Sequence, residues 1–140
     1  MSAVLIVDDE DAVRAVLSRW LAAEGYEIGE ADTSEAALAA MARTSADVVL
    51  CDVEMPGQGG LWLAAQLRER YPMSAMVLAT AIDSVPPATS LQSGIVAYLV
   101  KPFVRAMVVS AVAHGVRWHA DAVERSLKRV DGDVARFTTR

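Results

Sequence analysis

The 140-residue sequence contains a single cysteine, Cys51. It can therefore form neither an intrachain disulfide nor a cysteine-based metal cage. It also lacks an uninterrupted apolar run near the ~18 residues that a membrane-spanning helix requires. The longest apolar-rich stretch, residues 103–116, is broken by basic, hydroxyl and histidine side chains. No basic segment precedes an apolar one at the start of the chain, so we expect no signal peptide, no membrane association and a cytoplasmic location.

Basic side chains are also scarce, with 13 Lys and Arg against 18 Asp and Glu and a net charge of −5. Residues 1–113 carry 7 basic and 14 acidic side chains, whereas residues 114–140 carry 6 and 4. Such an acidic body argues against direct binding of nucleic acid. Only two lysines occur beside 11 arginines, which draws attention to Lys101. Apolar residues make up 54% of the chain, enough for the core of one domain.

Apolar runs of strand length alternate with segments of helical periodicity. This alternation predicts five βα units, with a parallel sheet covered by helices on both faces. We expect a long last helix from near Phe103. The other expected elements are strands over 3–7, 26–31, 47–51, 75–79 and 97–100, a first helix ended by Gly25, a second capped by Thr33 or Ser34, a third over 61–70 and a short fourth within 83–94.

Polar residues follow four of the predicted strands: Asp8 and Asp9, then Asp52, then Thr80, then Lys101. Ligands of parallel sheets bind at the carboxyl ends of the strands, so these side chains are expected at one edge. Converging carboxylates repel one another unless a cation joins them, and oxygen ligands favour Mg²⁺ or Mn²⁺. A lysine and a hydroxyl suit a phosphoryl group, and a carboxylate can be its nucleophile.

Four motifs carry a resemblance to a known family: Val7-Asp8-Asp9-Glu10, Leu50-Cys51-Asp52-Val53-Glu54-Met55-Pro56-Gly57, Ala79-Thr80-Ala81 and Tyr98-Leu99-Val100-Lys101-Pro102-Phe103. In this order, each at its own strand end, they resemble the receiver domain of two-component response regulators over residues 3–120. The resemblance implies the flavodoxin-like, CheY-like α/β fold with strand order 2-1-3-4-5. One departure is Pro86-Pro87, which lies where the fourth helix should begin.

The resemblance also implies a role for each acidic residue of the site. Asp52 would accept a phosphoryl group from a sensor histidine kinase or a histidine phosphotransfer protein. Asp9 would bind the metal directly and Asp8 through water, with Asp52 and the backbone carbonyl of Glu54 as further ligands. The chain would thus be a signalling switch that needs Mg²⁺ or Mn²⁺, with no enzymatic activity beyond gaining and losing its own phosphoryl group.

The remaining implied residues would bind the phosphoryl group and transmit its presence. Lys101 would contact the phosphoryl oxygens, and Thr80 would turn to hydrogen-bond them. Tyr98 would turn inward as Thr80 moves. The peptide bond before Pro102 would be cis, a geometry that is accessible before proline.

The alternative class is a Mg²⁺-dependent phosphatase or hydrolase with an aspartate nucleophile. Such enzymes usually place a second acid/base two residues after the nucleophile, and Glu54 has this spacing from Asp52. However, the chain has no insertion that would build a substrate cap. We therefore expect a switch, and the lifetime of its acyl phosphate against turnover of an external phosphoester would separate the two classes.

Residues 121–140 extend beyond the predicted receiver domain of residues 1–120. Val116, Val123, Val130 and Phe137 recur every seven residues, which is typical of a helix that packs on another helix. This extension would be a linker to an output domain or a seam of a homodimer, in which the last strand and helix could also take part. The alternative is a solvated helix that ends at residues 131–133, because glycine within a helix costs ~1 kcal/mol.

Overall fold

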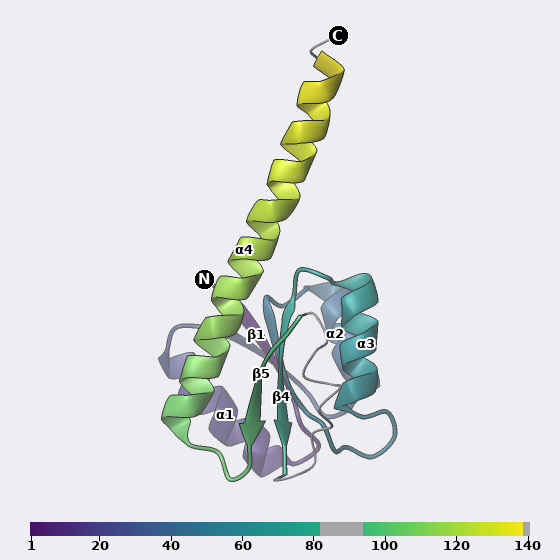
Figure 1. Ribbon diagram of the computed structural model, residues 1–140. Helices are drawn as coiled ribbons and strands as arrows, with labels where there is room; N and C mark the ends of the chain where they lie inside the picture. The colour runs from purple at the N-terminus through teal and green to yellow at the C-terminus, as the bar shows by residue number, and fades with distance from the viewer. Residues whose placement is uncertain (82–93, 139–140) are drawn as a thin grey trace.

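The computed structural model describes residues 1–81 and 94–138 (Figure 1). The short helix expected within 83–94, with Pro86-Pro87, lies outside the described residues. The elements in chain order are β1 (Ala3–Val7), α1 (Asp11–Ala23), β2 (Glu27–Ala31), α2 (Ser34–Arg43), β3 (Val48–Asp52), α3 (Gly60–Arg70), β4 (Ala75–Thr80), β5 (Ile95–Val100) and α4 (Arg105–Thr138).

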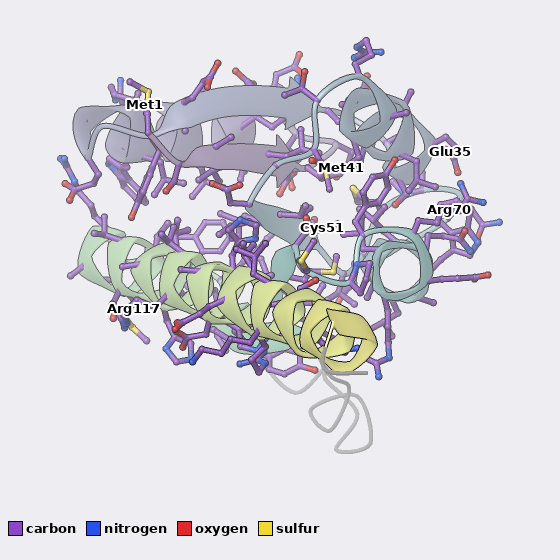
Figure 2. The ribbon with its side chains drawn as sticks, turned by 90° about the horizontal axis from the view of Figure 1, so that it is seen from above. Met1, Glu35, Met41, Cys51, Arg70 and Arg117 are labelled. Carbon is purple, nitrogen blue, oxygen red and sulfur yellow. The ribbon has the colours of Figure 1, made fainter. Side chains whose placement is uncertain are left out.

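The five strands form one parallel sheet in the order β2-β1-β3-β4-β5, which confirms the predicted fold class. Helices α1 and α4 cover one face and α2 and α3 the other (Figure 1). Strands β1, β3 and β4 are buried on both faces, as their continuous apolar sequences predict. Cys51 lies between the helical layers as a buried apolar residue (Figure 2).

The local signals at the helix ends act as the sequence predicts. Gly25 adopts a φ of +93° just beyond α1, a conformation that glycine adopts without steric cost. Thr33 caps α2, since its hydroxyl oxygen accepts a hydrogen bond from the Ala36 N–H at 3.0 Å. These caps fix where the chain leaves each helix and enters the next strand.

Several boundaries differ from the sequence-based expectation, and Thr80, expected to follow the fourth strand, is the last residue of β4. Asp52 is the last residue of β3 and does not follow it. Strand β5 begins at Ile95, because the Met76 N–H donates to the Gly94 carbonyl at 2.7 Å and so lengthens the pairing with β4. Helix α4 begins at Arg105, beyond the turn at Lys101-Pro102 that directs the chain away from the sheet.

Helix α4 continues through residues 131–133 to Thr138, so the alternative of a helix that ends there is wrong. Its first part packs tightly on the sheet, because a Cβ on Gly115 would lie 3.1 Å from both Val48 methyl carbons. Ala122 is still buried, whereas Leu127 is 61% exposed. Beyond this point α4 projects away from the sheet (Figure 1). No helix of the described residues is both long and apolar enough to span a membrane.

Polar groups at the amino end of the sheet also hold α4 in place. The two ring nitrogens of His119 lie 2.6 Å from the Met73 carbonyl oxygen and 3.3 Å from Asp47 Oδ1. The other carboxylate oxygen of Asp47 accepts a hydrogen bond from the Ala3 N–H at 3.2 Å. Thus α4 is linked to loops that precede β3 and β4 and to the first residue of β1.

Candidate functional site

The carboxyl ends of four strands bring together the side chains that the sequence predicts. Asp52 ends β3 and Thr80 ends β4, while Asp8 and Lys101 directly follow β1 and β5. The register pairs Asp52 with Ala79 and Thr80 with Val100, so these ends are level with one another. Asp8, Asp52 and Thr80 are only 2%, 4% and 1% exposed, which marks this edge as a place where charge is buried.

Lys101 joins two of the buried carboxylates. Its ammonium lies 3.0 Å from Asp52 Oδ2 and 3.6 Å from Asp8 Oδ2. The same ammonium lies 5.9 Å from the centre of the Phe103 ring. Two backbone features position this side chain: the Lys101 N–H donates to the Thr80 carbonyl at 2.9 Å, and the Lys101-Pro102 peptide bond is cis, as expected from the resemblance.

A second cluster consists of carboxylates alone. Oxygens of Asp8, Asp9 and Glu10 lie within 4.8 Å of one another, and Asp9 and Glu10 are exposed to solvent. The Glu10 N–H donates to Asp8 Oδ1 at 2.8 Å, which fixes the turn between them. Hard carboxylate oxygens at this spacing suit a divalent cation such as Mg²⁺. Sequence reasoning did not assign Glu10 to the site, although its position beside Asp9 was a signal.

Asp52 lies outside this three-carboxylate group and has other partners. Its Oδ1 accepts a hydrogen bond from the Glu54 N–H at 3.0 Å. The next residue, Val53, donates its N–H to the Ala79 carbonyl at 2.8 Å, which keeps the chain beside β4 after β3 has ended. One carboxylate oxygen of Asp52 is therefore held by the backbone, and the other faces Lys101.

The loop after Asp52 returns close to its own start and requires glycine there. A Cβ on Gly60 would lie 2.6 Å from the Asp52 carbonyl oxygen and 2.9 Å from the Val53 Cα. Both are backbone atoms and cannot turn away. The buried Ser34 hydroxyl donates to the Gly59 carbonyl at 3.2 Å and ties the loop to α2. Sequence reasoning identified this segment as a loop but did not assign these contacts.

Arg14 on α1 supports the turn after β1 from outside. Its guanidinium donates to the Asp8 carbonyl at 2.6 Å and lies 3.4 Å from Glu30, and it also pairs with Asp11. Arg14 was not predicted as part of the site. The sequence did contain a signal for the ion pair with Asp11, because residues three apart on a helix lie on the same side and can contact each other.

Burial and charge act in opposite directions on the pKa values of the site. Burial raises the pKa of Asp8, although the Glu10 N–H and the Lys101 ammonium oppose that rise. Burial alone would lower the pKa of Lys101, but the hydrogen bond and charge of Asp52, with the charge of Asp8, outweigh burial and raise it. Lys101 therefore remains a cation here, able to offset negative charge.

Thr80 and Tyr98 are near the site but do not contact its carboxylates. The Thr80 hydroxyl donates to the neighbouring Ala81 carbonyl at 3.1 Å. The Tyr98 hydroxyl on β5 is buried and has no hydrogen-bond partner within the described residues. Burial also raises the pKa of Tyr98. A buried hydroxyl without a partner is uncommon, and within the described residues Tyr98 shares this feature with Ser18 on α1.

A parallel five-stranded sheet with helices on both faces and polar side chains at its carboxyl edge defines the class of doubly wound α/β domains that bind ligands at that edge. Residues 4–113 match the response regulator receiver domain family. The match covers most of the chain, which therefore belongs to this family. The signalling module expected from the resemblance is thus confirmed.

Individual proteins of known sequence or structure agree with this assignment. The chain is 40% identical over 111 residues to the response regulator protein FleR of Pseudomonas aeruginosa, covering 79% of this chain and 24% of FleR. It therefore spans about a quarter of the length of that relative. The crystal structure of the response regulator TrrA from Thermotoga maritima, in complex with Mg²⁺-BeF, is 33% identical with a TM-score of 0.75, covering 82% of this chain and 99% of TrrA.

One larger structure also matches part of the chain beyond residue 113. The structure of NtrX from Brucella abortus has a TM-score of 0.78 and 24% identity, covering 95% of this chain and 29% of NtrX. At that identity the match shows the fold alone. It includes part of the chain beyond the family match, which ends at residue 113.

Proposed function

We propose that this chain accepts a phosphoryl group on Asp52 from a sensor histidine kinase or a histidine phosphotransfer protein. The observation that carries the proposal is the position of the Lys101 ammonium, 3.0 Å from Asp52 and 3.6 Å from Asp8. A carboxylate oxygen of Asp52 forms a bond to phosphorus as the bond between phosphorus and the donor nitrogen breaks. The donor imidazole leaves, and the Lys101 cation offsets charge on the phosphoryl oxygens.

The acidic group supports a requirement for Mg²⁺ in this reaction. Asp9 is the direct ligand in the proposal and Asp8 acts through water, with Asp52 and the Glu54 carbonyl completing the protein ligands. The oxygens of Asp8, Asp9 and Glu10 lie close enough to share one cation. A bound Mg²⁺ would offset the charge of the transferring phosphoryl group. Without the ion, the crowded carboxylates repel one another.

Intact-mass measurement after incubation with phosphoramidate and Mg²⁺ tests the acceptor. Wild type should gain one phosphoryl group, and Asp52→Ala should gain none. Asp32→Ala is the matched control, because Asp32 is an exposed aspartate that follows β2 at the same edge. Equal labelling of wild type and Asp52→Ala would overturn the assignment. Multiple turnovers of p-nitrophenyl phosphate would instead favour the hydrolase alternative.

Thr80 and Tyr98 form the switch in this proposal. The phosphoryl group adds roughly two negative charges beside Thr80, whose hydroxyl donates to the neighbouring Ala81 carbonyl. If Thr80 turns toward the phosphoryl oxygens, it leaves space that Tyr98 can enter, and the Tyr98 hydroxyl has no partner to lose among the described residues. The ligand shifts this equilibrium by its differential affinity for the two states.

Amide NMR with and without beryllofluoride tests the switch separately from the chemistry. In wild type, shifts should extend from the Asp52 loop to Tyr98 and α4. Thr80→Ala should keep the shifts around Asp52 and lose most of those around Tyr98. Thr44→Ala, at an exposed threonine after α2, is the matched control and should behave as wild type. Equal shifts in Thr80→Ala would remove Thr80 from the proposal.

The face of β5 and α4 is the output surface or homodimer interface that we propose. Val100, Val104 and Met107 expose apolar side chains there, with Met107 59% exposed. Val100 ends the strand that carries Tyr98, and Met107 on α4 lines the same hollow as Tyr98, so movement of Tyr98 would alter this face. Light scattering with and without beryllofluoride should show a change in mass in wild type that Met107→Glu prevents.

The proposed domain organisation is a receiver over residues 1–120 followed by an extension over 121–140. The unbroken α4 supports a linker toward an output domain, as does the coverage of this chain by the larger NtrX structure. Cytoplasmic location also remains a proposal, since a histidine kinase delivers its phosphoryl group there. Limited proteolysis should cut in the extension before it cuts the sheet.

A further inference from the structure

A second polar site lies at the opposite end of the molecule from Asp52. A cavity of about 480 Å³ opens between the end of α3, the loop before β4 and the projecting part of α4. Residues of α3 and α4 line this cavity together, and Figure 2 shows the molecule from above, with α4 running obliquely across the view. Pro72 and Met73 line the cavity just before β4 begins, whereas Thr80 ends that strand. At about 3.3 Å per residue, β4 separates the two sites by roughly 17 Å.

The charged side chains that line this cavity are all basic. Arg68 comes from the last turn of α3, and Arg125 and Arg129 come from α4. The two α4 arginines are four residues apart, so they lie on one side of the helix. No carboxylate of the described residues is part of the lining. This concentration of positive charge stands out in a body whose residues 1–113 are strongly acidic.

The ion pairs on α4 show which of its basic side chains can bind an anion. Lys128 lies 3.2 Å from Glu124 and is already paired. Within the described part of the chain, neither Arg125 nor Arg129 forms an ion pair. Both arginines are exposed, so they are accessible from solvent. An anion held by Arg125 and Arg129 would therefore relieve repulsion between these two guanidinium groups without breaking an ion pair that either of them forms with the described residues.

The other lining residues indicate the kind of anion. Trp118 and Ser126 also line the cavity, and Ser126 directly follows Arg125 on α4. Guanidinium forks match the paired oxygens of phosphate, and an indole offers a flat surface to a ring. The cavity volume falls within the range of small-molecule sites, roughly 300–1,000 Å³. Several cations around one small hollow fit the concentrated charge of phosphates better than the dispersed carboxylates of an acidic peptide.

We infer that this cavity binds a nucleotide, with its phosphates on Arg125, Arg129 and Arg68 and its base against Trp118. Such a ligand would bridge α3 and α4 where α4 leaves the body. The site would thus link the direction of the projecting helix to the concentration of a soluble nucleotide. Phosphorylation of Asp52 is not required for this binding, because the two sites are at opposite ends of the sheet.

Isothermal titration of the full chain in EDTA tests the inference, with ADP, GDP, pyrophosphate and hexaglutamate as probes. EDTA prevents binding of phosphates through a metal at the acidic edge. ADP or GDP should bind more tightly than pyrophosphate, because only the nucleotides have a ring for Trp118. Arg125→Ala/Arg129→Ala should weaken nucleotide binding at least tenfold, since two charge-assisted hydrogen-bond donors are lost.

Three variants make the result specific. Lys128→Ala removes one positive charge from the same helical turn outside the cavity, and binding should change less than about twofold. Trp118→Leu should weaken nucleotides about fivefold or more, while pyrophosphate binding stays the same. Asp52→Ala should bind as wild type does. Thermal melts verify that each variant is folded. If Trp118→Leu does not fold, the arginine variants still test the inference, because Arg125 and Arg129 are exposed and their replacement should not disturb the core.

Several outcomes would overturn the inference. Absence of heat with both nucleotides at millimolar concentration would do so. An equal loss in Lys128→Ala and Arg125→Ala/Arg129→Ala would show attraction by net charge alone. Tighter binding of hexaglutamate than of ADP and GDP would show that the cavity is a site for an acidic peptide and not for a nucleotide.

Discussion

The two ends of the sheet treat their polar groups in opposite ways. At the amino end, the Asp47 carboxylate, the Ser74 hydroxyl and both His119 nitrogens each have a partner on a different segment. At the carboxyl end, carboxylates crowd together, and the Tyr98 hydroxyl has no partner within the described residues. The amino end is thus organised for stability, and the carboxyl end keeps unsatisfied groups that the proposed metal and phosphoryl group would use.

Matched glycine substitutions at the carboxyl and amino ends of the sheet should give the largest difference in stability. Gly60→Ala forces a Cβ against backbone atoms of Asp52 and Val53, so we expect the free energy of unfolding to fall by about 3 kcal/mol. Phosphorylation should also slow, since Asp52 must shift. In Gly115→Ala the new Cβ meets only Val48 methyl groups and an Ala75 Cβ, and the helix gains about 1 kcal/mol in propensity.

Chemical denaturation with intact-mass labelling measures both effects. Gly115→Ala should remain within about 1 kcal/mol of wild type, because the tighter packing and the gain in helix propensity oppose each other. If Gly60→Ala were as stable as Gly115→Ala, the loop after Asp52 would not be held in the close approach described above.

Magnesium should sharpen the difference between the two ends. At ten times its dissociation constant, Mg²⁺ should stabilise wild type by about 1.4 kcal/mol. Asp9→Asn should lose most of this gain and should be at least as stable as wild type in EDTA, because one crowded carboxylate is removed. Thermal melts with EDTA and with Mg²⁺ measure both. Asp32→Asn is the control, and an equal response of Asp9→Asn and wild type to Mg²⁺ would exclude Asp9 as a ligand.

A hydroxyl from each end provides a smaller test. Ser74→Ala removes a buried hydrogen bond of 2.7 Å to the Ala46 carbonyl and should cost about 1 kcal/mol. Tyr98→Phe removes a hydroxyl that has no partner in the described part of the chain, and it should leave stability unchanged or raise it by up to about 1 kcal/mol. A loss in Tyr98→Phe equal to that in Ser74→Ala would show that Tyr98 already has a partner.

The pKa of Tyr98 adds a pH dependence to this comparison. Because burial raises that pKa, the folded state holds its proton after the unfolded state has lost it. Stability associated with Tyr98 is therefore present below about pH 10 and is lost as pH rises toward the folded pKa. Tyr98→Phe should lose less stability than wild type over this alkaline range in urea titrations.

Strand pattern and chemistry at the strand ends were predictable from the sequence for physical reasons. Strands buried on both faces, such as β1 and β3, are continuously apolar, and parallel topology brings Asp8, Asp52 and Lys101 to one edge. The close approach of Gly60 to the backbone of Asp52 was not predictable, because it depends on the path of the loop that joins them. The His119 contacts depend on where α4 crosses the sheet, which periodicity does not determine.

The smallest expected effect comes from His119 itself. His119→Ala removes a bond to the Met73 carbonyl and a partly exposed contact with Asp47, so the free energy of unfolding should fall by only about 0.5–1 kcal/mol. Asp47 keeps its hydrogen bond from the Ala3 N–H, which limits the loss. His114→Ala, at an exposed histidine of the same helix, should change stability less. The rate of phosphoryl uptake by Asp52 should not change, because the described contacts of His119 are with Met73 and Asp47 at the amino end of the sheet. A slower rate in His119→Ala would mean that the two ends of the sheet are coupled through α4.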